Sequence, residues 1–248
     1  MTLDAWRLEE LSLNSSAPPG QLLYDGWVLR LAPGKAKRAR SINPVYPSAV
    51  PIAEKIAYCE QLYASVGLPA IFRITPFTQP PGLEMELEQR GYGRFDVTAV
   101  ESAALQPERF DGATVESLPL EEWVAIVGAL RRSSREQCAG HLSRLQGCPL
   151  AKLPAVLKVE GRVVATGLTI IEGAAAGIFD IITDETQRRA GHARRLVAGL
   201  LAHAWSRGAR DAYLQVDQAN TPARDLYRQF GFTERYLYWY RGRPGEQN

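Results

Sequence analysis

A short run of basic and small residues, Arg188-Arg189-Ala190-Gly191-His192-Ala193, lies between two apolar segments of different pattern. Residues 177–183 read as a strand, and residues 194–205 read as a helix. Such a loop leaves backbone N–H groups unpaired where the helix begins, and these groups bind anionic oxygens, phosphate above all. Gly191 lets the main chain approach a ligand closely, and arginines at 188, 189, 194 and 195 add positive charge. The pattern indicates a phosphorylated ligand, although a plain strand-to-helix connection can look the same.

The loop matches neither of two common phosphate motifs. A P-loop needs Gly-Lys-Ser/Thr, and a dinucleotide fingerprint needs three spaced glycines. The segments that follow are more informative. Residues 211–216 read as a strand, and Asn220-Thr221-Pro222 has a capping residue and a proline suited to the first turn of a helix. Residues 236–240 form a closing aromatic strand.

These features together resemble the GNAT superfamily of N-acetyltransferases, over residues from about 113 to 241. The acetyl-CoA loop of that family reads Gln/Arg-x-x-Gly-x-Gly/Ala and is present as Arg188-x-x-Gly191-x-Ala193. A later family pattern is present in the same order, as Asn220, Ala223, Leu226-Tyr227 and Gly231-Phe232. Two positions depart from the family: Glu185 stands where many relatives have proline, and His192 where an aliphatic residue is common. Neither departure removes a backbone donor.

The resemblance implies a set of cofactor-binding residues. The backbone of Ile181, Ile182 and Thr183 is expected to bind the pantetheine arm of acetyl-CoA. The loop residues expected around the pyrophosphate are Arg188, Arg189, Ala190, Gly191, His192, Ala193 and Arg194. Asn220 is expected to contact the cofactor or to cap its helix, and Ala223 and Tyr227 are also expected at the cofactor.

Two residues are candidates for proton transfer. A primary amine with a pKa of ~10.4 is about one part in a thousand neutral at pH 7, so a base or ordered water must remove a proton before it attacks a thioester. Asp180, flanked by apolar residues, is the candidate base, although it could instead be a buried carboxylate bonded to backbone or arginine. The resemblance makes Tyr227 the general acid for the leaving thiolate; the alternative is a core aromatic. A backbone N–H near Ile182 would polarise the carbonyl.

The composition describes a folded chain of one large or two ordinary domains. The 248 residues are 46% hydrophobic and 23% charged, with a net charge of +2 that gives no reason to expect nucleic acid or a membrane as partner. No apolar run reaches the ~18 residues of a membrane span. Three cysteines form no even framework and indicate a reducing cytoplasm. The scattered histidines and cysteines predict no metal site.

The first half of the chain repeats the pattern of the second. Hairpins are expected around Asp25-Gly26 and Glu160-Gly161, each followed by matching helices and strands. We therefore predict an α/β (α+β) fold of two tandem GNAT-like domains, each a mixed, largely antiparallel twisted sheet flanked by helices. A degenerate domain would cover residues 1–106, and an acetyl-CoA-binding catalytic domain residues 107–248. Three prolines in 42–51 remove donors from the loop of the first half.

The sequence favours an N-acetyltransferase that moves an acetyl group from acetyl-CoA to a primary amine of a small molecule, such as an amino acid, by direct attack. Helices at 118–132 and 134–145 would line the acceptor side, where Arg131, Arg132 and Arg135 would suit an acidic or zwitterionic substrate. Two alternatives remain: a non-catalytic acyl-CoA-binding module, and an aminoacyl transferase with tandem GNAT-like halves. A monomer and a homodimer are equally compatible with the sequence.

Overall fold

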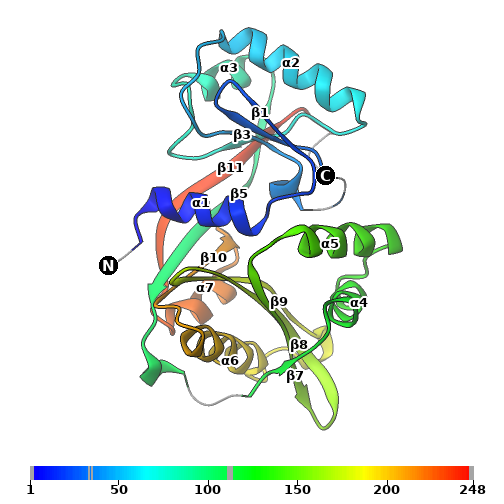
Figure 1. The fold of residues 1–248 in the computed structure, drawn as a ribbon, viewed down its shortest axis with the longest axis vertical. Helices are drawn as coiled ribbons and strands as arrows, with labels where there is room; N and C mark the ends of the chain where they lie inside the picture. Colours follow the sequence, from blue (N-terminus) through cyan, green and yellow to red (C-terminus); the bar gives the residue numbers. More distant parts are fainter. Residues whose placement is uncertain (1–2, 33, 35, 111–113, 246–248) are drawn as a thin grey trace. The chain divides into compact units, whose positions relative to one another are not determined.

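The chain has a mixed α/β fold, as predicted, with twisted sheets flanked by helices (Figure 1). The computed structural model describes residues 3–32, 34, 36–110 and 114–245. The fold divides into two compact units. The first unit comprises Met1–Ser15, Val100–Val216 and Asn220–Arg235, and the second comprises Ser16–Ala99, Asp217–Ala219 and Tyr236–Asn248. These units differ from a simple division at residue 106, because the N-terminal helix belongs to the first unit and the last strand ends in the second.

The first unit contains the predicted loop. Its helices are α1 (Ala5–Ser15), α4 (Leu120–Arg131), α5 (Arg135–Gly147), α6 (His192–Ser206) and α7 (Thr221–Arg228). Its strands are β6 (Glu116–Ser117), β7 (Ala151–Val159), β8 (Arg162–Glu172), β9 (Ala175–Thr183) and β10 (Asp211–Asp217), with parts of β5 (Gly93–Ala104) and β11 (Thr233–Gly242). The sheet runs β5-β10-β9-β8-β7-β6. The β9–β10 pair is parallel, and β6 to β9 are antiparallel.

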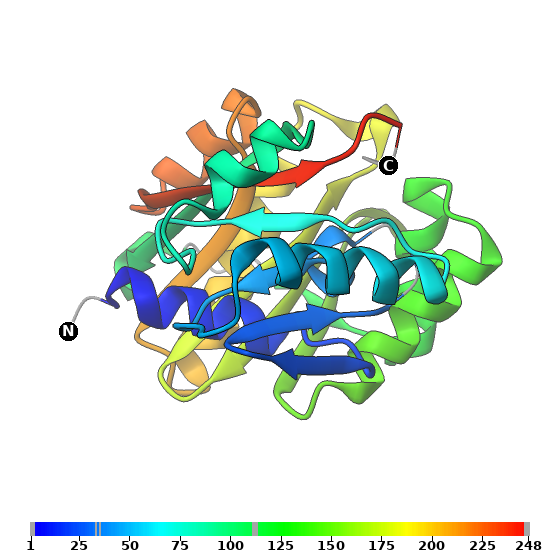
Figure 2. The ribbon, with the colours of Figure 1, turned by 90° about the horizontal axis from the view of Figure 1, so that it is seen from above.

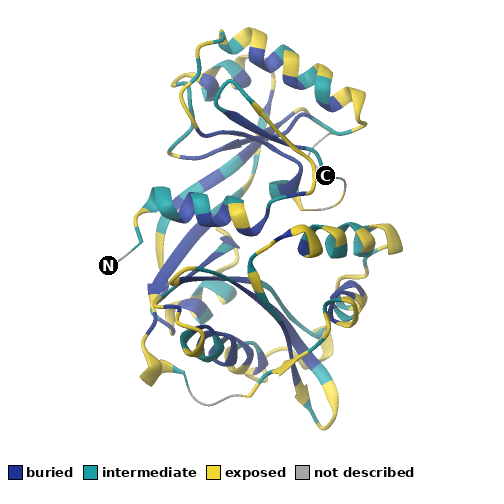
Figure 3. Ribbon diagram, viewed as in Figure 1, coloured by how far each residue is buried: buried dark blue, intermediate teal, exposed yellow. Residues whose placement is uncertain are grey.

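Helices cover both faces of this sheet. A side chain at Gly167 would meet Leu200 and Leu196 of α6, so this position of β8 faces α6. The next residue, Leu168, packs into a core with Trp123 of α4 and with α5. Because successive residues of a strand point to opposite faces, α6 lies on one face and the α4–α5 pair on the other. Figure 3 shows the inward side of α6 buried and its outward side exposed.

The second unit repeats the strand arrangement of the first. Its elements are β1 (Gln21–Tyr24), β2 (Trp27–Arg30), β3 (Ile42–Pro44), α2 (Ile52–Ser65), β4 (Phe72–Ile74) and α3 (Leu83–Gln89), with parts of β5 and β11. The pairs β1–β2 and β2–β3 are antiparallel, and β3–β4 is parallel. The first unit has the same sequence of pairings from β7 to β10. Figure 2 shows α2 lying across β1 to β3, and its residues Ile56 and Tyr63 share a core with Trp27.

Local patterns correctly predicted most elements. Both hairpins turn at the predicted pairs, with Asp25, Gly26, Glu160 and Gly161 at positive φ. Helices α4, α5, α6 and α7 correspond to those predicted at 118–132, 134–145, 194–205 and after Asn220. Among the elements that the sequence analysis missed are α1, β6 and β3. The last of these occupies a segment that we expected to be a loop.

Candidate active site

The strands β9 and β10 separate after a short parallel ladder. Their pairing runs from Ala175–Asp211 to Ile178–Leu214, whereas β9 continues to Thr183. On its other side β9 remains paired with β8 as far as Thr183. Within the described part of the chain, the edge of β9 that faces β10 therefore has no strand partner beyond residue 178. An extended ligand arm can bind such an edge in the manner of an added strand.

A β-bulge lies at the beginning of this unpaired edge. Leu168 of β8 pairs with Phe179, and Thr166 pairs with Ile182, so β9 has one extra residue between these two pairs. Asp180 lies in the bulge with φ of +51°, a left-handed conformation that is rare for a residue with a side chain. Bulges of this kind redirect side chains and end pairing. The bulge thus coincides with the separation of the strands.

The loop after β9 has free backbone N–H groups at the point where the next helix, α6, begins. Arg189 and Gly191 have φ of +67° and +77°, and Gly191 is the N-cap of α6 without any side-chain cap. None of the N–H groups from Arg188 to Arg194 donates to an acceptor among the described residues. The first intrahelical bond at this end is from Arg195 N to Gly191 O. A helix terminus with unsatisfied amides is a ready anion site.

The positively charged side chains around the loop form few ion pairs with acidic residues of the described chain. The four loop arginines are exposed, and within the described chain only Arg188 lies within ion-pair distance of an acid, at 3.8 Å from Glu185. His192 is 8% exposed, and its Nδ1 is buried with no hydrogen-bond partner among the described residues. Unpaired cations and an unsatisfied polar atom beside free amides are the features that an anionic ligand would satisfy. This part of the site fits a pyrophosphate.

The corresponding loop of the second unit is closed by an internal carboxylate. Asp25, in the β1–β2 turn, accepts hydrogen bonds from Ala49 N and Val50 N, just before α2 begins, at 2.9–3.1 Å. These bonds hold the pKa of Asp25 below its ordinary value, and the nearby Lys55 ammonium acts in the same direction. Lys55 Nζ is fully buried, 3.0 Å from Asp25 Oδ2 and 4.2 Å from the centre of the Trp27 ring. An acidic side chain therefore already binds the amides at this helix terminus.

The helix α7 places Tyr227 and Asn220 as the sequence predicts. Asn220 is the N-cap, and its Oδ1 accepts from Ala223 N at 3.2 Å, so its predicted capping role is confirmed. Tyr227 is 7% exposed and packs against Phe232. Burial, together with the charge of Glu101, raises the pKa of Tyr227 to about 12. The phenol is therefore protonated at neutral pH and is available as a proton donor.

Asp180 lies in a cluster of cationic side chains from α4 and α5. Its Oδ1 accepts a hydrogen bond from Arg131 Nη2 at 2.6 Å, and its Oδ2 lies 3.2 Å from His141 Nε2. Burial would raise the pKa of this carboxyl, but His141 and the charges of Arg131 and Arg144 outweigh it and hold the pKa well below its ordinary value. Asp180 is therefore ionised and a weak base. This is the arginine-bonded arrangement that the sequence left open as the alternative to a general base.

His141 is the residue near the bulge that the sequence analysis missed. It lies in a polar helix with no local motif, and only the packing of α5 brings it to β9. Its ring is 5.8 Å from that of Trp123, at 65°, and its side chain is 13% exposed. Of the cations predicted on the acceptor side, Arg131 reaches Asp180 and Arg132 reaches Glu185 at 3.2 Å, whereas Arg135 is exposed.

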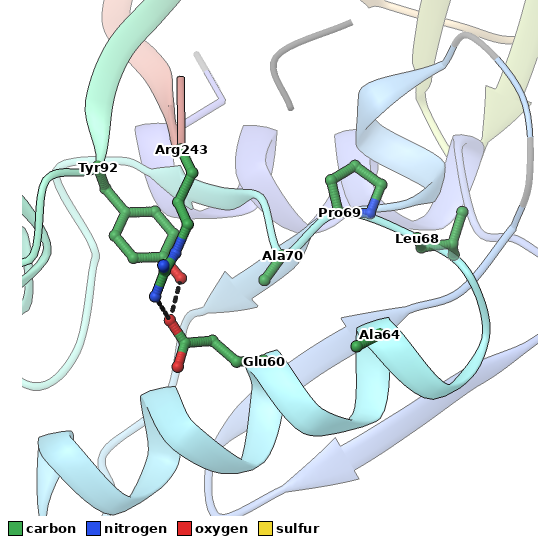
Figure 4. Close-up of a pocket in the computed structure, with 7 residues that line it drawn as sticks. All are labelled: Glu60, Ala64, Leu68, Pro69, Ala70, Tyr92 and Arg243. Atoms are coloured by element: carbon green, nitrogen blue, oxygen red, sulfur yellow. Dashed lines mark hydrogen bonds and ion pairs between the residues drawn. The ribbon is translucent and has the colours of Figure 1, made fainter. Parts of the chain in front are cut away.

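A cavity of about 230 Å³ lies in the second unit and is lined by residues of that unit (Figure 4). At one end the Glu60 carboxylate accepts hydrogen bonds from Tyr92 Oη and Arg243 Nη2, both at 2.6 Å. Small and apolar residues, among them Leu68 and Ala70, line the rest. Because these polar groups already satisfy one another, the cavity presents no free group for chemistry. It does not alter the assignment of the site to the first unit.

Comparison with known proteins agrees with this geometry. The family model described as "Probable histone acetyltransferase Rv0428c C-terminal" matches residues 7–241. A structure described as a GCN5-related N-acetyltransferase from Kribbella flavida is similar with a TM-score of 0.70 and 19% identity, covering 99% of this chain and 97% of that one. A putative GNAT-family acetyltransferase from Novosphingobium aromaticivorans gives 0.56 and 17%, covering 90% and 91%. Among curated proteins, none matches.

The chain thus belongs to the Rv0428c C-terminal family and has the GNAT fold. It is a GNAT-type acetyltransferase, an acyltransferase enzyme, and this fold implies that it binds acetyl-CoA and an acceptor. In the residues that the structure describes, no helix is long and apolar enough to cross a membrane. No cluster of three or more potential metal ligands occurs in that same part of the chain.

Proposed function

We propose that the first unit binds acetyl-CoA through the loop Arg188–Arg194 and the open edge of β9. The observation that carries this proposal is the run of backbone amides at the beginning of α6 with no acceptor among the described residues. Their donors, the α6 dipole and the loop arginines would hold the pyrophosphate. Ile181, Ile182 and Thr183, beyond the last β9–β10 pair, would hold the pantetheine arm. Asn220, Ala223 and Tyr227 would border it from α7.

The acceptor in this proposal is a primary amine of a small molecule that also carries a carboxylate. The acceptor-side helices bring Arg131 to Asp180 in the bulge and Arg132 to Glu185 in the loop after β9, and the charge of Arg144 also acts on Asp180. These three arginines outnumber the two carboxylates that they meet, and the excess of positive charge would favour an amino acid over a lysine-rich peptide. The family description names histones, so a histone-tail peptide is the second candidate. It would need to bind elsewhere than beside these arginines.

The proposed reaction is a direct attack of the neutral amine on the thioester. A backbone N–H near Ile182, at the unpaired edge of β9, would stabilise the oxyanion. Tyr227 would donate a hydrogen bond, and finally a proton, to the departing sulfur. Its raised pKa keeps this proton in place until a basic thiolate forms. No covalent intermediate with the protein is needed.

The first half of the chain would act as a degenerate repeat without cofactor. The shared pairing pattern of β1–β4 and β7–β10 supports tandem GNAT-like halves. The Asp25 carboxylate, bonded to the loop amides, supports the loss of pyrophosphate binding from the first half. The division into residues 1–106 and 107–248, the cytoplasmic location and a monomeric or homodimeric state remain predictions.

Two measurements test the proposal together. Calorimetry with coenzyme A should give binding to one site per chain. A thiol-release assay with acetyl-CoA and amino acids, polyamines, aminoglycosides and a histone-tail peptide should give turnover with amino acids above the others. Binding without turnover on any amine would favour a non-catalytic acyl-CoA module, whereas no binding would refute the loop assignment. Transfer from charged tRNA, without a need for acetyl-CoA, would identify an aminoacyl transferase.

A further inference from the structure

A histidine and an aspartate, both mostly buried, meet beside the bulge of β9. The side chains of His141 and Asp180 are 13% and 15% exposed, with Nε2 and Oδ2 3.2 Å apart. The imidazole packs edge-on against Trp123, whose own Nε1 donates to Ala155 O at 3.1 Å. Packing therefore restrains the ring of His141 and keeps its Nε2 3.2 Å from the Asp180 carboxylate, although the two atoms do not have the geometry of a hydrogen bond.

The backbone beneath this pair is in an unfavourable conformation. Asp180 has φ of +51° although it has a side chain, and such conformations cost on the order of 1–3 kcal/mol and persist where the surroundings impose them. Here the bulge turns the carboxylate toward His141 and Arg131. The pair lies two residues beyond the last β9–β10 contact, Ile178–Leu214. If the open edge holds the thioester arm, as proposed above, the pair lies beside the reacting carbonyl.

We propose that His141 is the catalytic residue that takes a proton from the acceptor ammonium, and that Asp180 is a positioning residue for His141. This inference rests on the proposed function. The charged group beside the imidazole is Asp180 from β9, and Asp180 in turn interacts with Arg131 from α4 and with the charge of Arg144 from α5. In this proposal the Asp180 carboxylate keeps the imidazole beside the bulge, so removal of Asp180 should misplace His141 and slow the reaction.

His141 and Tyr227 together account for every proton that moves in the reaction. One ammonium proton passes to His141 and then to water, which leaves a neutral amine. The lone pair of the amine nitrogen forms the bond to the carbonyl carbon, and the electron pair of the C–S bond leaves with sulfur. Tyr227 gives its proton to that sulfur and regains one from the same nitrogen. The products are an amide, a thiol and one proton released to solvent.

The test compares His141→Gln and Asp180→Asn with a control, His203→Gln, in the full-length protein. Asparagine suits the positive φ at 180, and His203 lies in α6, whose N-terminus is at the loop. With the best amine of the panel above, His141→Gln should lower kcat/KM about 100-fold at pH 7. Asp180→Asn should lower it about 10-fold in the same assay. The control should match the wild type, and calorimetry should give all four proteins the same affinity for coenzyme A.

The pH profile separates a base from a structural residue. In His141→Gln, kcat/KM should rise about tenfold per pH unit from pH 7 to 9, because only the amine that is already neutral reacts. The wild type should level off in that range. Hydroxylamine, which is neutral at pH 7, should react at nearly the same rate with both proteins. An unchanged rate and slope in His141→Gln would overturn this inference alone, whereas an inactive wild type would overturn the proposed function and this inference with it.

Discussion

Replacement of Gly191 by glutamate should abolish binding of coenzyme A without unfolding the protein. Gly191 is the N-cap of α6 at φ +77°, and a β-carbon there meets no atom within 4 Å. A side chain in this left-handed conformation costs about 1–2 kcal/mol. The larger effect is on the ligand, because the new carboxylate would compete with the pyrophosphate for the amides of residues 188–194. The Asp25 carboxylate makes such bonds with the loop before α2.

The size of the effect follows from the bonds that would be lost. A hydrogen bond to a charged group contributes about 1.5–3 kcal/mol, so losing two of them removes about 3–6 kcal/mol. Since about 1.4 kcal/mol corresponds to a factor of ten in affinity, Kd should rise at least about 100-fold. Repulsion between the new carboxylate and the phosphates adds to this loss.

Calorimetry with coenzyme A is the assay, and Gly208→Glu is the matched control. Gly208 follows the other end of α6, at φ +95°, and a β-carbon there also meets no atom within 4 Å. It therefore has comparable strain and the same added charge, and should keep the wild-type affinity. Gly191→Ala adds strain without the carboxylate and should fall between the two. Wild-type affinity in Gly191→Glu, with a cooperative thermal transition, would refute the loop assignment.

Three further changes test other parts of the structure. Tyr227→Phe should lower kcat roughly 10–100-fold through loss of one proton donor, with the affinity for coenzyme A unchanged; an unaltered kcat would remove Tyr227 from the mechanism. The lowered pKa of Asp25 means that its ionised form is favoured in the folded state. Its contribution to stability is therefore present above the unfolded-state value near pH 4 and is lost as pH falls below that value. The drop in Tm between pH 6 and pH 3 should thus be smaller in Asp25→Asn, and an equal drop would contradict the carboxylate's role. Trp123→Ala, which empties a fully buried site, should reduce the free energy of unfolding by about 3–5 kcal/mol in urea titration; a loss below about 1 kcal/mol would contradict the packing.

The parts predicted correctly from sequence are those fixed by neighbouring residues. The hairpin turns, the cap at Asn220 and the helix after Gly191 depend on a few adjacent side chains, so their patterns are readable. By contrast, α1 is held in the first unit through contacts distant in sequence, such as the bond from Tyr213 Oη to Leu11 O at 3.0 Å. The residues next to Leu11 or Tyr213 in the sequence give no sign of such a contact.

The chemistry of the candidate site shows the same limit. The loop amides are a property of the main chain between β9 and α6, and a short motif is enough to predict them. The environment of Asp180 depends on side chains from α4 and α5, which are separated from Asp180 in the sequence by β7 and β8. The sequence could therefore mark Asp180 as unusual but could not determine whether it is a base. Its low pKa comes from His141 and Arg131, which are neighbours only in the folded chain.

The two units share a topology but differ in the loop that precedes the helix. In both, two antiparallel pairs and a parallel pair lead through a loop to a helix N-terminus. In the first unit the amides of that loop have no acceptor among the described residues, whereas in the second Asp25 binds them. Removing Asp25 should not create a second coenzyme site, because Pro47 and Pro51 have no N–H to offer. Under the proposed function, cofactor binding depends first on which backbone donors the loop has free, and only secondarily on the sheet that supports the loop.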